Sequence, residues 1–264
     1  MAGNTSVLIT GASTGIGAVY ADRFAQRGHN LVLVARDAGR LSTLAETLKA
    51  QYGIQVEVLP ADLTDPSALE ALAQRLSNDN SIGVLVNNAG MNIPGAFLAQ
   101  NIADINHLIS VNLNAVVTLA HAAAGRFAAE GRGDIINLAS VVGLAPEFGM
   151  AIYGASKAFV LYLSQALSLE LGPRGVYVQA VLPAATRTEI WERSGVDVNS
   201  LSGVMDAGDM VDAALVGYDS REPVTIPPLH NEDQWILYEQ ARKTMLTEFQ
   251  QEHPAPRYRN KTDE

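Results

Sequence analysis

The stretch Val7–Gly17, VLITGASTGIG, joins an apolar run to a glycine-rich turn that opens a helical segment. Gly11 allows the tight turn, Gly15 lets the backbone approach a pyrophosphate, and Gly17 lets the helix pack close to the strand. The free N–H groups and the positive end of the helix then face the phosphates. Because a strand and a helix flank the glycines, the stretch predicts a dinucleotide-binding site; the alternative is a plain turn without a ligand.

The rest of the chain repeats this alternation of short apolar runs and helical segments. Near-continuous apolar runs are typical of strands that are buried on both faces of a parallel sheet. The candidate strands are Val7–Thr10, Asn30–Ala35, Val56–Leu59, Ile82–Asn87, Asp134–Ala139, Val176–Leu182 and Val224–Ile226. Between them, buried helical faces are expected at Leu41, Leu44, Ala45 and Leu48, and at Leu161, Ala166, Leu167 and Leu171. The pattern predicts an α/β, doubly wound Rossmann fold, with a seven-stranded parallel sheet flanked by helices on both faces.

Two dipeptides mark helix ends, and the terminal region has its own character. Asp65-Pro66 is typical of an N-cap followed by the first helical residue, and Gly172-Pro173 of a helix end. We expect a single Rossmann-type catalytic domain over residues 1–252, with a mobile lid at about 189–209. A helix at about 231–251 would close this domain, and residues 253–264 would form a polar tail.

Composition excludes several classes of function. The chain has 264 residues, 48% of them hydrophobic and 17% charged, with a net charge of −10. Without a basic face, no nucleic-acid binding is expected. There are no cysteines, and histidines such as His107 and His121 are scattered, so no metal site is expected. Met1–Ser6 do not begin a secretory signal, and runs such as Val84–Val86 are too short for a bilayer, so we expect a cytoplasmic protein without a membrane partner.

The end of the second candidate strand indicates which cofactor fits. It reads Val34-Ala35-Arg36-Asp37, without an acidic residue at the position where a site for NAD accepts bonds from the ribose. Arg36 can form a charge-assisted fork with a 2′-phosphate, which favours NADP(H) over NAD(H). The alternative is that Arg36 is a solvated cation and Asp37 faces the ribose. Arg40, one turn later, either reaches the phosphate or is simply exposed.

Three residues are candidates for the chemistry. Tyr153 and Lys157 are four apart in a helical segment and therefore lie on one face. A nearby ammonium stabilises a phenolate, so we expect a lowered pKa for Tyr153, which would let it exchange protons near neutral pH. Ser140 ends a strand, where its hydroxyl can point into the crevice at the carboxyl edge of the sheet and bond a substrate oxygen.

Together these motifs resemble the short-chain dehydrogenase/reductase family, in its compact single-domain form with a Tyr-x-x-x-Lys motif. The resemblance covers about residues 5 to 190, and the motifs occur in the family's order. They are Thr10-Gly11-x-x-x-Gly15-x-Gly17, Asp62, Asn87-Asn88-Ala89-Gly90, Asn112, Ser140, Tyr153-x-x-x-Lys157 and Pro183 through Thr188. One departure is Ala184, where the family usually has Gly; a residue with a side chain cannot take a positive φ cheaply.

The resemblance implies roles for further residues. Asp62 and Leu63 would border the adenine, Asn87 and Ala89 would stabilise the sheet and border the ribose, and Thr188 would contact the carboxamide. Asn112 would hold a water that links Lys157, which binds the nicotinamide ribose, to solvent. The implied catalytic residues are Ser140, Tyr153, Lys157 and Asn112. The full set of expected cofactor-binding residues is Gly11, Ser13, Thr14, Gly15, Ile16, Gly17, Arg36, Asp62, Leu63, Asn88, Ala89, Gly90, Tyr153, Lys157, Pro183, Thr186 and Thr188.

We therefore expect an NADP(H)-dependent carbonyl reductase or alcohol dehydrogenase that transfers hydride directly between nicotinamide and a small-molecule carbonyl carbon. An apolar pocket for a small or medium ketone or aldehyde is expected from Met91–Ala96, Val141–Met150 and the lid. Its candidate lining residues are Ile93, Val142, Leu144, Phe148, Met150, Trp191 and Met205, although Trp191 and Met205 could equally be packing anchors.

Three alternatives remain open. The first is a 3-oxoacyl-thioester reductase whose acidic carrier protein would dock on Arg126, Arg132 and Arg174. The second is a non-catalytic NADP(H)-sensing regulatory module, and the third is a sugar-nucleotide epimerase, for which residues 189–264 leave little room. A homodimer or homotetramer is expected through two long helices, at about Asp104–Glu130 and Ala151–Leu171, as in relatives of this family.

Overall fold

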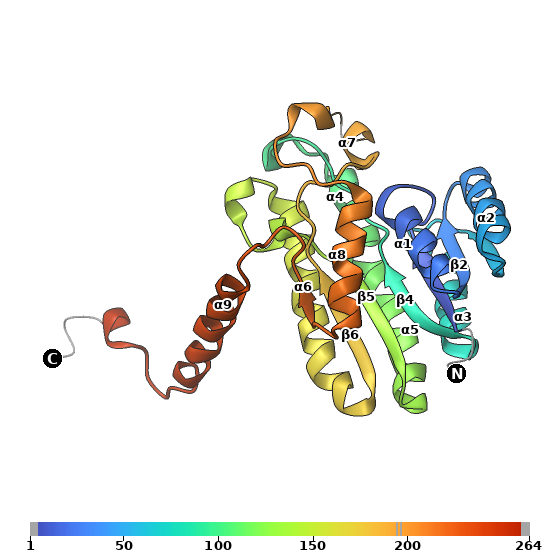
Figure 1. The fold of residues 1–264 in the computed structure, drawn as a ribbon. Coiled ribbons are helices and arrows are strands. Elements are labelled where there is room, and N and C mark those ends of the chain that lie inside the picture. The colour runs from blue at the N-terminus through green and yellow to red at the C-terminus, as the bar shows by residue number, and fades with distance from the viewer. Residues whose placement is uncertain (1–4, 194, 196, 260–264) are drawn as a thin grey trace. The chain divides into compact units, whose positions relative to one another are not determined.

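The computed structural model describes residues 5–193, 195 and 197–259. Within these residues, seven parallel strands form one sheet in the order β3-β2-β1-β4-β5-β6-β7 (Figure 1). The strands are β1 (Ser6–Thr10), β2 (Asn30–Ala35), β3 (Val56–Pro60), β4 (Ile82–Asn87), β5 (Gly133–Leu138), β6 (Val176–Val181) and β7 (Val224–Thr225). The predicted fold is confirmed, and each predicted strand lies within one residue of its observed ends.

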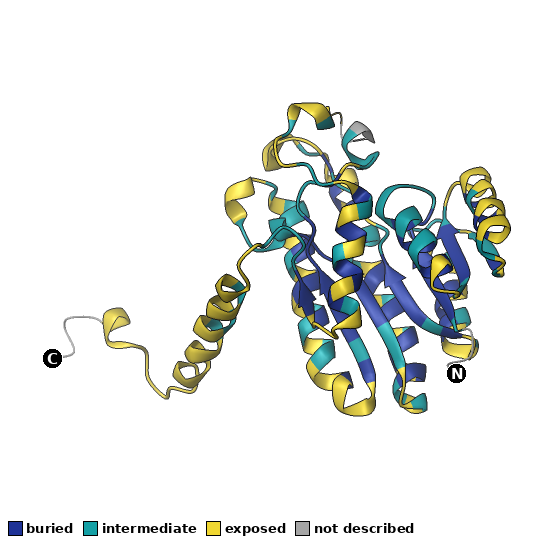
Figure 2. Ribbon diagram, viewed as in Figure 1, coloured by how far each residue is buried: buried dark blue, intermediate teal, exposed yellow. Residues whose placement is uncertain are grey.

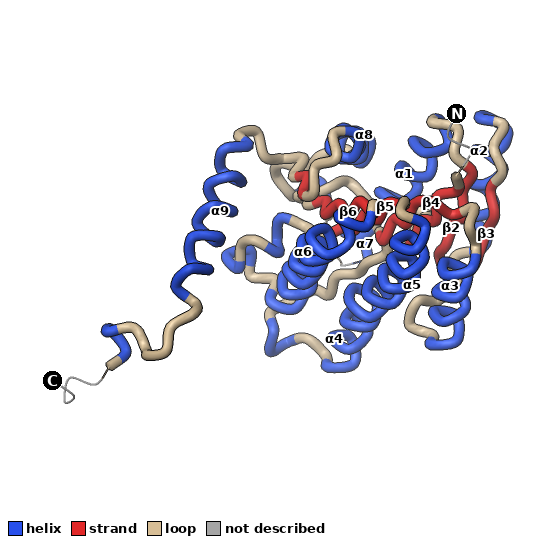
Figure 3. Tube along the Cα trace, turned by 90° about the horizontal axis from the view of Figure 1, so that it is seen from below, coloured by secondary structure: helices blue, strands red, loops and turns tan. Residues whose placement is uncertain are grey.

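Two layers of helices cover the sheet (Figure 3). One face carries α1 (Gly15–Gln26), α2 (Ala38–Tyr52) and α8 (Ala207–Asp219), and the other carries α3 (Pro66–Asn78), α5 (Ala115–Glu130) and α6 (Ala151–Leu171). Phe24 and Met210 belong to the core on the first face, and Leu119 and Phe127 to the core on the second. The strands and the inward faces of the helices are therefore buried, while the outward helix faces are exposed (Figure 2).

Helix α4 (Ile102–Ile109) continues into α5 through a π-helical turn at Ser110–Asn114. By length and composition, the combined helix Ile102–Glu130 could cross a membrane. However, α5 packs on β4 and β5 and buries Leu119 and Phe127 in the core. Its apolar character is therefore explained by its place in the α/β fold.

The predicted helix ends are also confirmed. Asp65 caps α3, its carboxylate accepting a hydrogen bond from the Ser67 N–H at 2.8 Å, and Pro66 is the first helical residue. Helix α6 ends at Leu171, directly before Gly172.

The predicted buried face of α6 is wrong at one position. Ala166 is exposed, whereas Ser164 is fully buried. The observed stripe runs through Lys157, Val160, Leu161, Ser164 and Leu171, at the three- and four-residue spacing of a helix. A serine can face the sheet because its hydroxyl is fully engaged: it accepts from the Asn137 amide of β5 at 2.9 Å and donates to the Val160 carbonyl at 2.7 Å.

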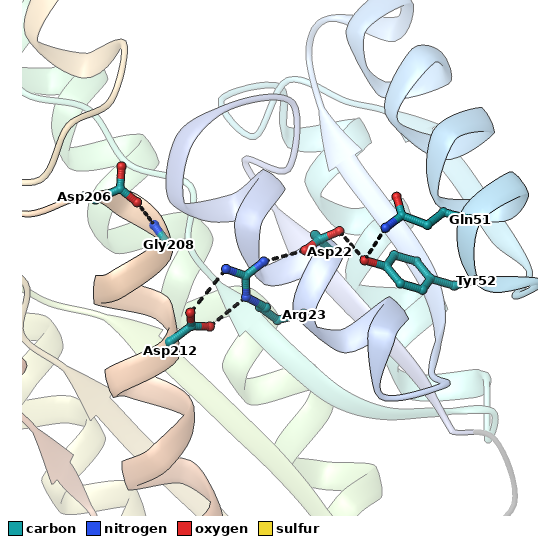
Figure 4. Close-up of polar contacts among 7 residues, drawn as sticks. All are labelled: Asp22, Arg23, Gln51, Tyr52, Asp206, Gly208 and Asp212. Atoms are coloured by element: carbon teal, nitrogen blue, oxygen red, sulfur yellow. Dashed lines mark hydrogen bonds and ion pairs between the residues drawn. The ribbon is translucent and has the colours of Figure 1, made fainter.

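A polar network joins α1 to α8 and α2 (Figure 4). The Arg23 guanidinium lies between the carboxylates of Asp22 and Asp212, at 2.6 and 2.7 Å. The Tyr52 hydroxyl donates to Asp22 at 2.8 Å. These residues line a surface hollow of about 700 Å³. Because its charges are paired with one another, we assign this network to helix packing.

Contacts within the chain divide it after Pro227. Residues 228–264 hold α9 (Glu232–Met245), followed by a short helical turn at Leu246–Glu248. Asn231 caps α9, its side chain accepting from the Asp233 N–H at 2.9 Å. Helix α9 is shorter than the expected 231–251. That residues up to 252 belong to the catalytic domain stays a prediction, and residues 260–264 of the expected tail lie outside the described residues.

Candidate functional site

A crevice of about 840 Å³ opens at the carboxyl ends of the strands. It lies where the chain order of the sheet reverses, with β1 between β2 and β4, which is where doubly wound folds bind ligands. All the predicted cofactor-binding residues line this crevice except Gly17. Of the predicted catalytic residues, Ser140, Tyr153 and Lys157 line it and Asn112 does not.

The glycine-rich turn forms one end of the crevice. Gly11 and Gly15 have φ values of +66° and +55°, which residues with side chains rarely adopt. Gly17 has a packing function, because a Cβ there would lie 2.3 Å from the Gly11 carbonyl oxygen. The structure thus assigns the third glycine to the contact between helix and turn, as the sequence predicts for it, and away from the crevice surface.

Helix α1 begins at this turn without a side-chain cap. Its N-cap residue, Thr14, makes no capping hydrogen bond, and no acidic residue lies in its first turn. In contrast, Asp37 caps α2, Asp65 caps α3 and Asp206 caps α8. The N–H groups and the positive dipole end of α1 are therefore available to an anion in the crevice, which fits a pyrophosphate.

The turn is held in place from β4. The Asn88 side chain donates to the carbonyls of Thr10 and Gly11, at 2.9 and 3.2 Å. The Thr10 hydroxyl in turn accepts from the backbone N–H groups of Asn88 and Ala89. The sequence motif contains Thr10 but does not predict this bracing function. Its structural function depends on a strand 76 residues away, which no local pattern reveals.

The part of the crevice next to the end of β2 carries two arginines. Arg36 and Arg40 both line it, and Asp37, the alternative ribose partner, has its carboxylate bonded to the Arg40 N–H as the cap of α2. Arg40 is neither free nor directed only to solvent: its guanidinium donates to both oxygens of Glu189, at 2.9 and 2.7 Å. This ion pair joins α2 to the segment after β6. No sequence pattern predicts it, because the two residues are 149 positions apart.

Asp62 and Leu63, the residues expected to border an adenine, both lie on the crevice wall, and that role stays a prediction. The pKa of Asp62 is lowered chiefly by hydrogen bonds from the backbone N–H and hydroxyl of Thr64, so its carboxylate is ionised. Leu63 is buried beside it on the crevice wall. Deeper in the sheet, the Asn87 side chain donates to Asn137 at 3.0 Å and links β4 to β5.

Ser140 and Tyr153 lie together at the centre of the crevice. Ser140 directly follows β5 and Ala139, and its hydroxyl donates to the Pro183 carbonyl at 3.1 Å. The expected lowering of the Tyr153 pKa is wrong for this geometry. Burial raises the pKa of Tyr153 to about 12, against a smaller opposite effect from a side-chain hydrogen bond with Ser140. The phenol is therefore protonated at neutral pH.

Lys157 explains part of that difference. Its ammonium donates to the Leu138 carbonyl at 2.7 Å and lies 5.7 Å from the centroid of the Tyr153 ring. Lys157 is 6% exposed, and burial lowers its pKa to about 8. The ammonium is thus directed to the end of β5, so it does not offset the effect of burial on the phenol.

Asn112 lies behind the crevice, in the π-helical turn, and is 1% exposed. Its side chain exchanges two hydrogen bonds with the backbone of Met91: the oxygen accepts from the N–H, and the amide donates to the carbonyl, both at 2.9 Å. The amide also donates to the Ser156 hydroxyl at 3.1 Å. The water between Asn112 and Lys157 that the family resemblance implies stays a prediction.

The segment after β6, which the family resemblance places beside the nicotinamide, lines another part of the crevice. Ala184 causes no backbone strain, since Arg221 is the only described residue other than glycine with a positive φ. The Thr186 carbonyl accepts from the Trp191 indole N–H at 2.7 Å, which anchors the start of the expected lid. Met205 pairs with Thr186 and packs against the core of the α1 face, so it is a packing residue. Helix α8 begins at Ala207, inside the expected lid range.

The predicted substrate-lining residues differ in burial and in position. Ile93 is buried with Ile105 and Leu108, in a small cluster against which Met91 and Tyr153 pack, and so supports the site from behind. Val142, Leu144 and Met150 are half-buried, whereas Phe148 is 56% exposed. Of the seven predicted residues, Trp191 borders the described crevice directly. Among the described residues, no three His, Asp or Glu side chains gather as a metal site would require.

The chain is similar to known proteins in both sequence and structure. The profile of the short chain dehydrogenase family matches residues 5–199. Among curated proteins, the very-long-chain 3-oxoacyl-CoA reductase of Podospora anserina is 33% identical over 244 residues, which cover 88% of this chain and 70% of the relative. The 17-beta-hydroxysteroid dehydrogenase type 3 of Rattus norvegicus is 34% identical over 184 residues, covering 69% of this chain and 60% of the relative. The chain thus spans well under the full length of these two relatives.

Two solved structures are more similar. The short-chain dehydrogenase of Sphingobium yanoikuyae in complex with NADPH is 58% identical, with a TM-score of 0.95 over 97% of this chain and 100% of that one. The bulky-bulky ketone specific alcohol dehydrogenase of Comamonas testosteroni is 54% identical, with a TM-score of 0.91 over 97% of this chain and 99% of that one. Because the family profile matches most of the chain and the fold and motifs agree with it, this protein belongs to the short chain dehydrogenase family.

Proposed function

We propose that this protein is an NADPH-dependent carbonyl reductase that converts ketones to secondary alcohols. The observation that carries the proposal is the pair of hydroxyls at the centre of the crevice. Tyr153 has a pKa raised to about 12, and its hydroxyl lies beside that of Ser140 in the crevice, which Trp191 also lines. A phenol that is protonated at neutral pH is suited to give a proton to a developing alkoxide, which is the reductive direction.

Different residues bind the substrate carbonyl and donate the proton during the reduction. NADPH, when bound, supplies the hydride to the carbonyl carbon. The Ser140 hydroxyl can turn from the Pro183 carbonyl, 3.1 Å away, to bond the carbonyl oxygen of the substrate. The Tyr153 hydroxyl delivers its proton to that oxygen as negative charge develops there. The products are an alcohol and NADP⁺, and Tyr153 must regain one proton from solvent before the next turnover.

The preference for NADPH is carried by Arg36. It lines the crevice directly after β2, and it makes no ion pair with the described residues. A 2′-phosphate would bond it as a charge-assisted fork. The relative from Sphingobium yanoikuyae, whose structure holds NADPH, supports this preference. Asp37, which would serve NAD, is already engaged as the cap of α2.

Arg36→Ala tests this preference. We expect the kcat/KM for NADPH to fall by about 10- to 100-fold and that for NADH to stay within about twofold. Arg174→Ala is the matched control, because Arg174 is an exposed arginine that precedes β6 at the opposite edge of the sheet. A loss of activity that is equal with both cofactors would contradict the assignment of Arg36 to the 2′-phosphate.

For the substrate, we propose ketones with two bulky substituents. The relative from Comamonas testosteroni is specific for bulky-bulky ketones, and it covers nearly the whole of this chain. Loss of NADPH absorbance should be followed with aryl alkyl and dialkyl ketones of increasing size on both sides of the carbonyl. We expect kcat/KM to rise with size on both sides; activity restricted to acetone-sized substrates would contradict this proposal.

A 3-oxoacyl thioester is the second candidate substrate, favoured by the similarity to the very-long-chain 3-oxoacyl-CoA reductase of Podospora anserina. The basic docking patch expected for it is wrong at Arg126. This residue is 9% exposed and donates to the carbonyls of Leu76 and Ile82, so it holds α5 to its neighbours. A higher kcat/KM for acetoacetyl-CoA than for any simple ketone would favour this candidate.

We further propose that the protein is a homodimer or homotetramer joined through α5 and α6. Exposed apolar side chains lie on both helices: Tyr162 (76% exposed) and Leu169 (80%) on α6, and Val117 (40%) on α5. A cluster of this kind is typical of an interface. Light scattering coupled to gel filtration should give a mass of two or four chains, and Leu169→Glu should lower it; a monomeric wild type would contradict the proposal.

A further inference from the structure

Ser156 lies between the two predicted catalytic residues of α6, and the sequence analysis assigned it no function. It is 4% exposed. Its hydroxyl donates to the Tyr153 carbonyl at 2.7 Å and accepts from the Asn112 amide at 3.1 Å. The serine therefore ties the turn of α6 that carries Tyr153 and Lys157 to the π-helical turn between α4 and α5.

The Asn112 side chain makes this tie rigid. Its oxygen and one amide hydrogen are both bonded to the Met91 backbone, and Ser156 accepts from the same amide nitrogen. Ser156 thus gives the second amide hydrogen its partner at a buried position, since Asn112 is 1% exposed and Ser156 is 4% exposed. A buried donor left without a partner is costly, so this geometry is strongly preferred. Three segments meet here: the loop after β4, the π-helical turn and α6.

The same cluster borders the Lys157 ammonium. A Cβ built on Gly90 would lie 3.5 Å from the Asn112 side-chain oxygen and 3.5 Å from Lys157 Nζ. The two groups therefore flank one glycine on the crevice wall. Any shift of α6 away from Asn112 would move Lys157 relative to the Leu138 carbonyl and Tyr153 relative to Ser140.

We propose that Ser156 is a positioning residue, which holds the Tyr153–Lys157 turn in register with Asn112 so that the phenol faces the substrate carbonyl. This inference rests on the proposed reductase function. Ser156 does not border the crevice and touches neither substrate nor cofactor in it. Its effect is on the placement of the proton donor, and small displacements of a donor have large effects on rate.

The chain offers a closely matched control two turns along the same helix. Ser164 is fully buried, donates to the Val160 carbonyl at 2.7 Å and accepts from the Asn137 amide at 2.9 Å. It therefore makes the same kinds of hydrogen bond as Ser156, to a backbone carbonyl in the preceding turn and from an asparagine. However, it lies beneath the sheet centre and not beside the crevice.

The experiment compares S156A, S164A and Ser156→Thr in the full chain, with NADPH and the best ketone of the panel. We expect both alanine variants to lower Tm by similar amounts. S156A should lower kcat at least about tenfold, with KM for NADPH within about twofold of wild type, whereas S164A should keep kcat within about twofold. Ser156→Thr keeps the hydroxyl and should recover most of the lost kcat.

The pH dependence of kcat gives a second readout. Burial alone lowers the pKa of Lys157, and burial with the Ser140 bond determines that of Tyr153. A loosened turn admits water, so S156A should move the limb governed by Lys157 towards higher pH, while S164A should leave it in place. If S156A does not fold, Ser156→Cys, which keeps the volume and weakens both bonds, carries the same expectations.

The outcomes separate this inference from the proposed function. A folded S156A with wild-type kcat and pH profile would overturn the function of Ser156 and leave the reductase intact. Equal losses of kcat in S156A and S164A would also overturn it, because they would indicate a general effect of core destabilisation. A wild type without activity on any ketone or thioester would overturn the proposed function and this inference with it.

Discussion

Replacing Lys157 by Met should stabilise the folded protein at neutral pH, although it removes a predicted catalytic group. Burial lowers the pKa of Lys157 from 10.5 to about 8. At about 1.4 kcal/mol for each pKa unit, keeping the buried ammonium charged at pH 7 costs about 3 kcal/mol. Met has a similar length and no charge, so the substitution removes this cost. It also removes the hydrogen bond to the Leu138 carbonyl, and this loss destabilises the folded protein by about 1–2 kcal/mol. The expected net gain is about 1–2 kcal/mol.

The gain should depend on pH with a definite sign. Below pH 8 the lysine is charged in both the folded and the unfolded chain, so the full cost is present. Between about 8 and 10.5 only the unfolded chain keeps the proton, so wild-type stability rises with pH, and above 10.5 the cost disappears. The advantage of Lys157→Met should therefore shrink by about 2 kcal/mol between pH 7 and pH 9.5.

Equilibrium urea unfolding at both pH values, at one protein concentration and without cofactor, measures these free energies. Lys49→Met is the control, since it makes the same substitution at an exposed lysine in the last turn of α2. The reasoning is refuted if Lys157→Met is less stable than wild type at pH 7, or if its stability difference is the same at both pH values.

Three further substitutions test other parts of the account. Gly17→Ala would place a Cβ 2.3 Å from the Gly11 carbonyl oxygen. We expect Tm to fall by several °C in a thermal-shift assay and NADPH binding to be lost in a fluorescence titration. A wild-type Tm would contradict the close packing. Glu189→Gln should release Arg40 for the 2′-phosphate and tighten NADPH binding by up to about fivefold, with no effect on NADH; weaker NADPH binding would contradict this. Arg126→Met leaves two buried carbonyls without their donor and should lower the free energy of unfolding, measured with urea, by about 2–4 kcal/mol, with kcat unchanged. A decrease below about 0.5 kcal/mol would contradict the structural function of this arginine.

The strands could be predicted because burial on both faces leaves a plain signal. Runs such as Asn30–Ala35 and Ile82–Asn87 are almost wholly apolar, and both coincide with observed strands. The start of α3 was predictable for a different reason, since Asp65 and Pro66 act on their own local backbone. The crevice could be predicted because the carboxyl ends of parallel strands lie at one edge of the sheet and because the glycines mark the turn between β1 and α1.

The remaining features depend on partners that are distant in the sequence. Arg40 and Glu189 are 149 residues apart, so only the folded chain shows that they pair. The direction of the Tyr153 pKa depends on burial and on where the Lys157 ammonium points, and helical spacing fixes neither. Ala166 was expected in the core by its apolar character, whereas Ser164 occupies the buried face because β5 supplies a partner for its hydroxyl.

The central claim is that the Tyr153 hydroxyl gives its proton to a carbonyl oxygen during reduction by NADPH. The most direct test is the rate of NADPH oxidation by Tyr153→Phe with saturating ketone, alongside its NADPH affinity from fluorescence titration. The account predicts a fall in kcat of at least about 10³-fold, with the Kd for NADPH within about threefold of wild type. A Tyr153→Phe enzyme that binds NADPH normally and reduces the ketone at a rate near that of wild type would contradict the account.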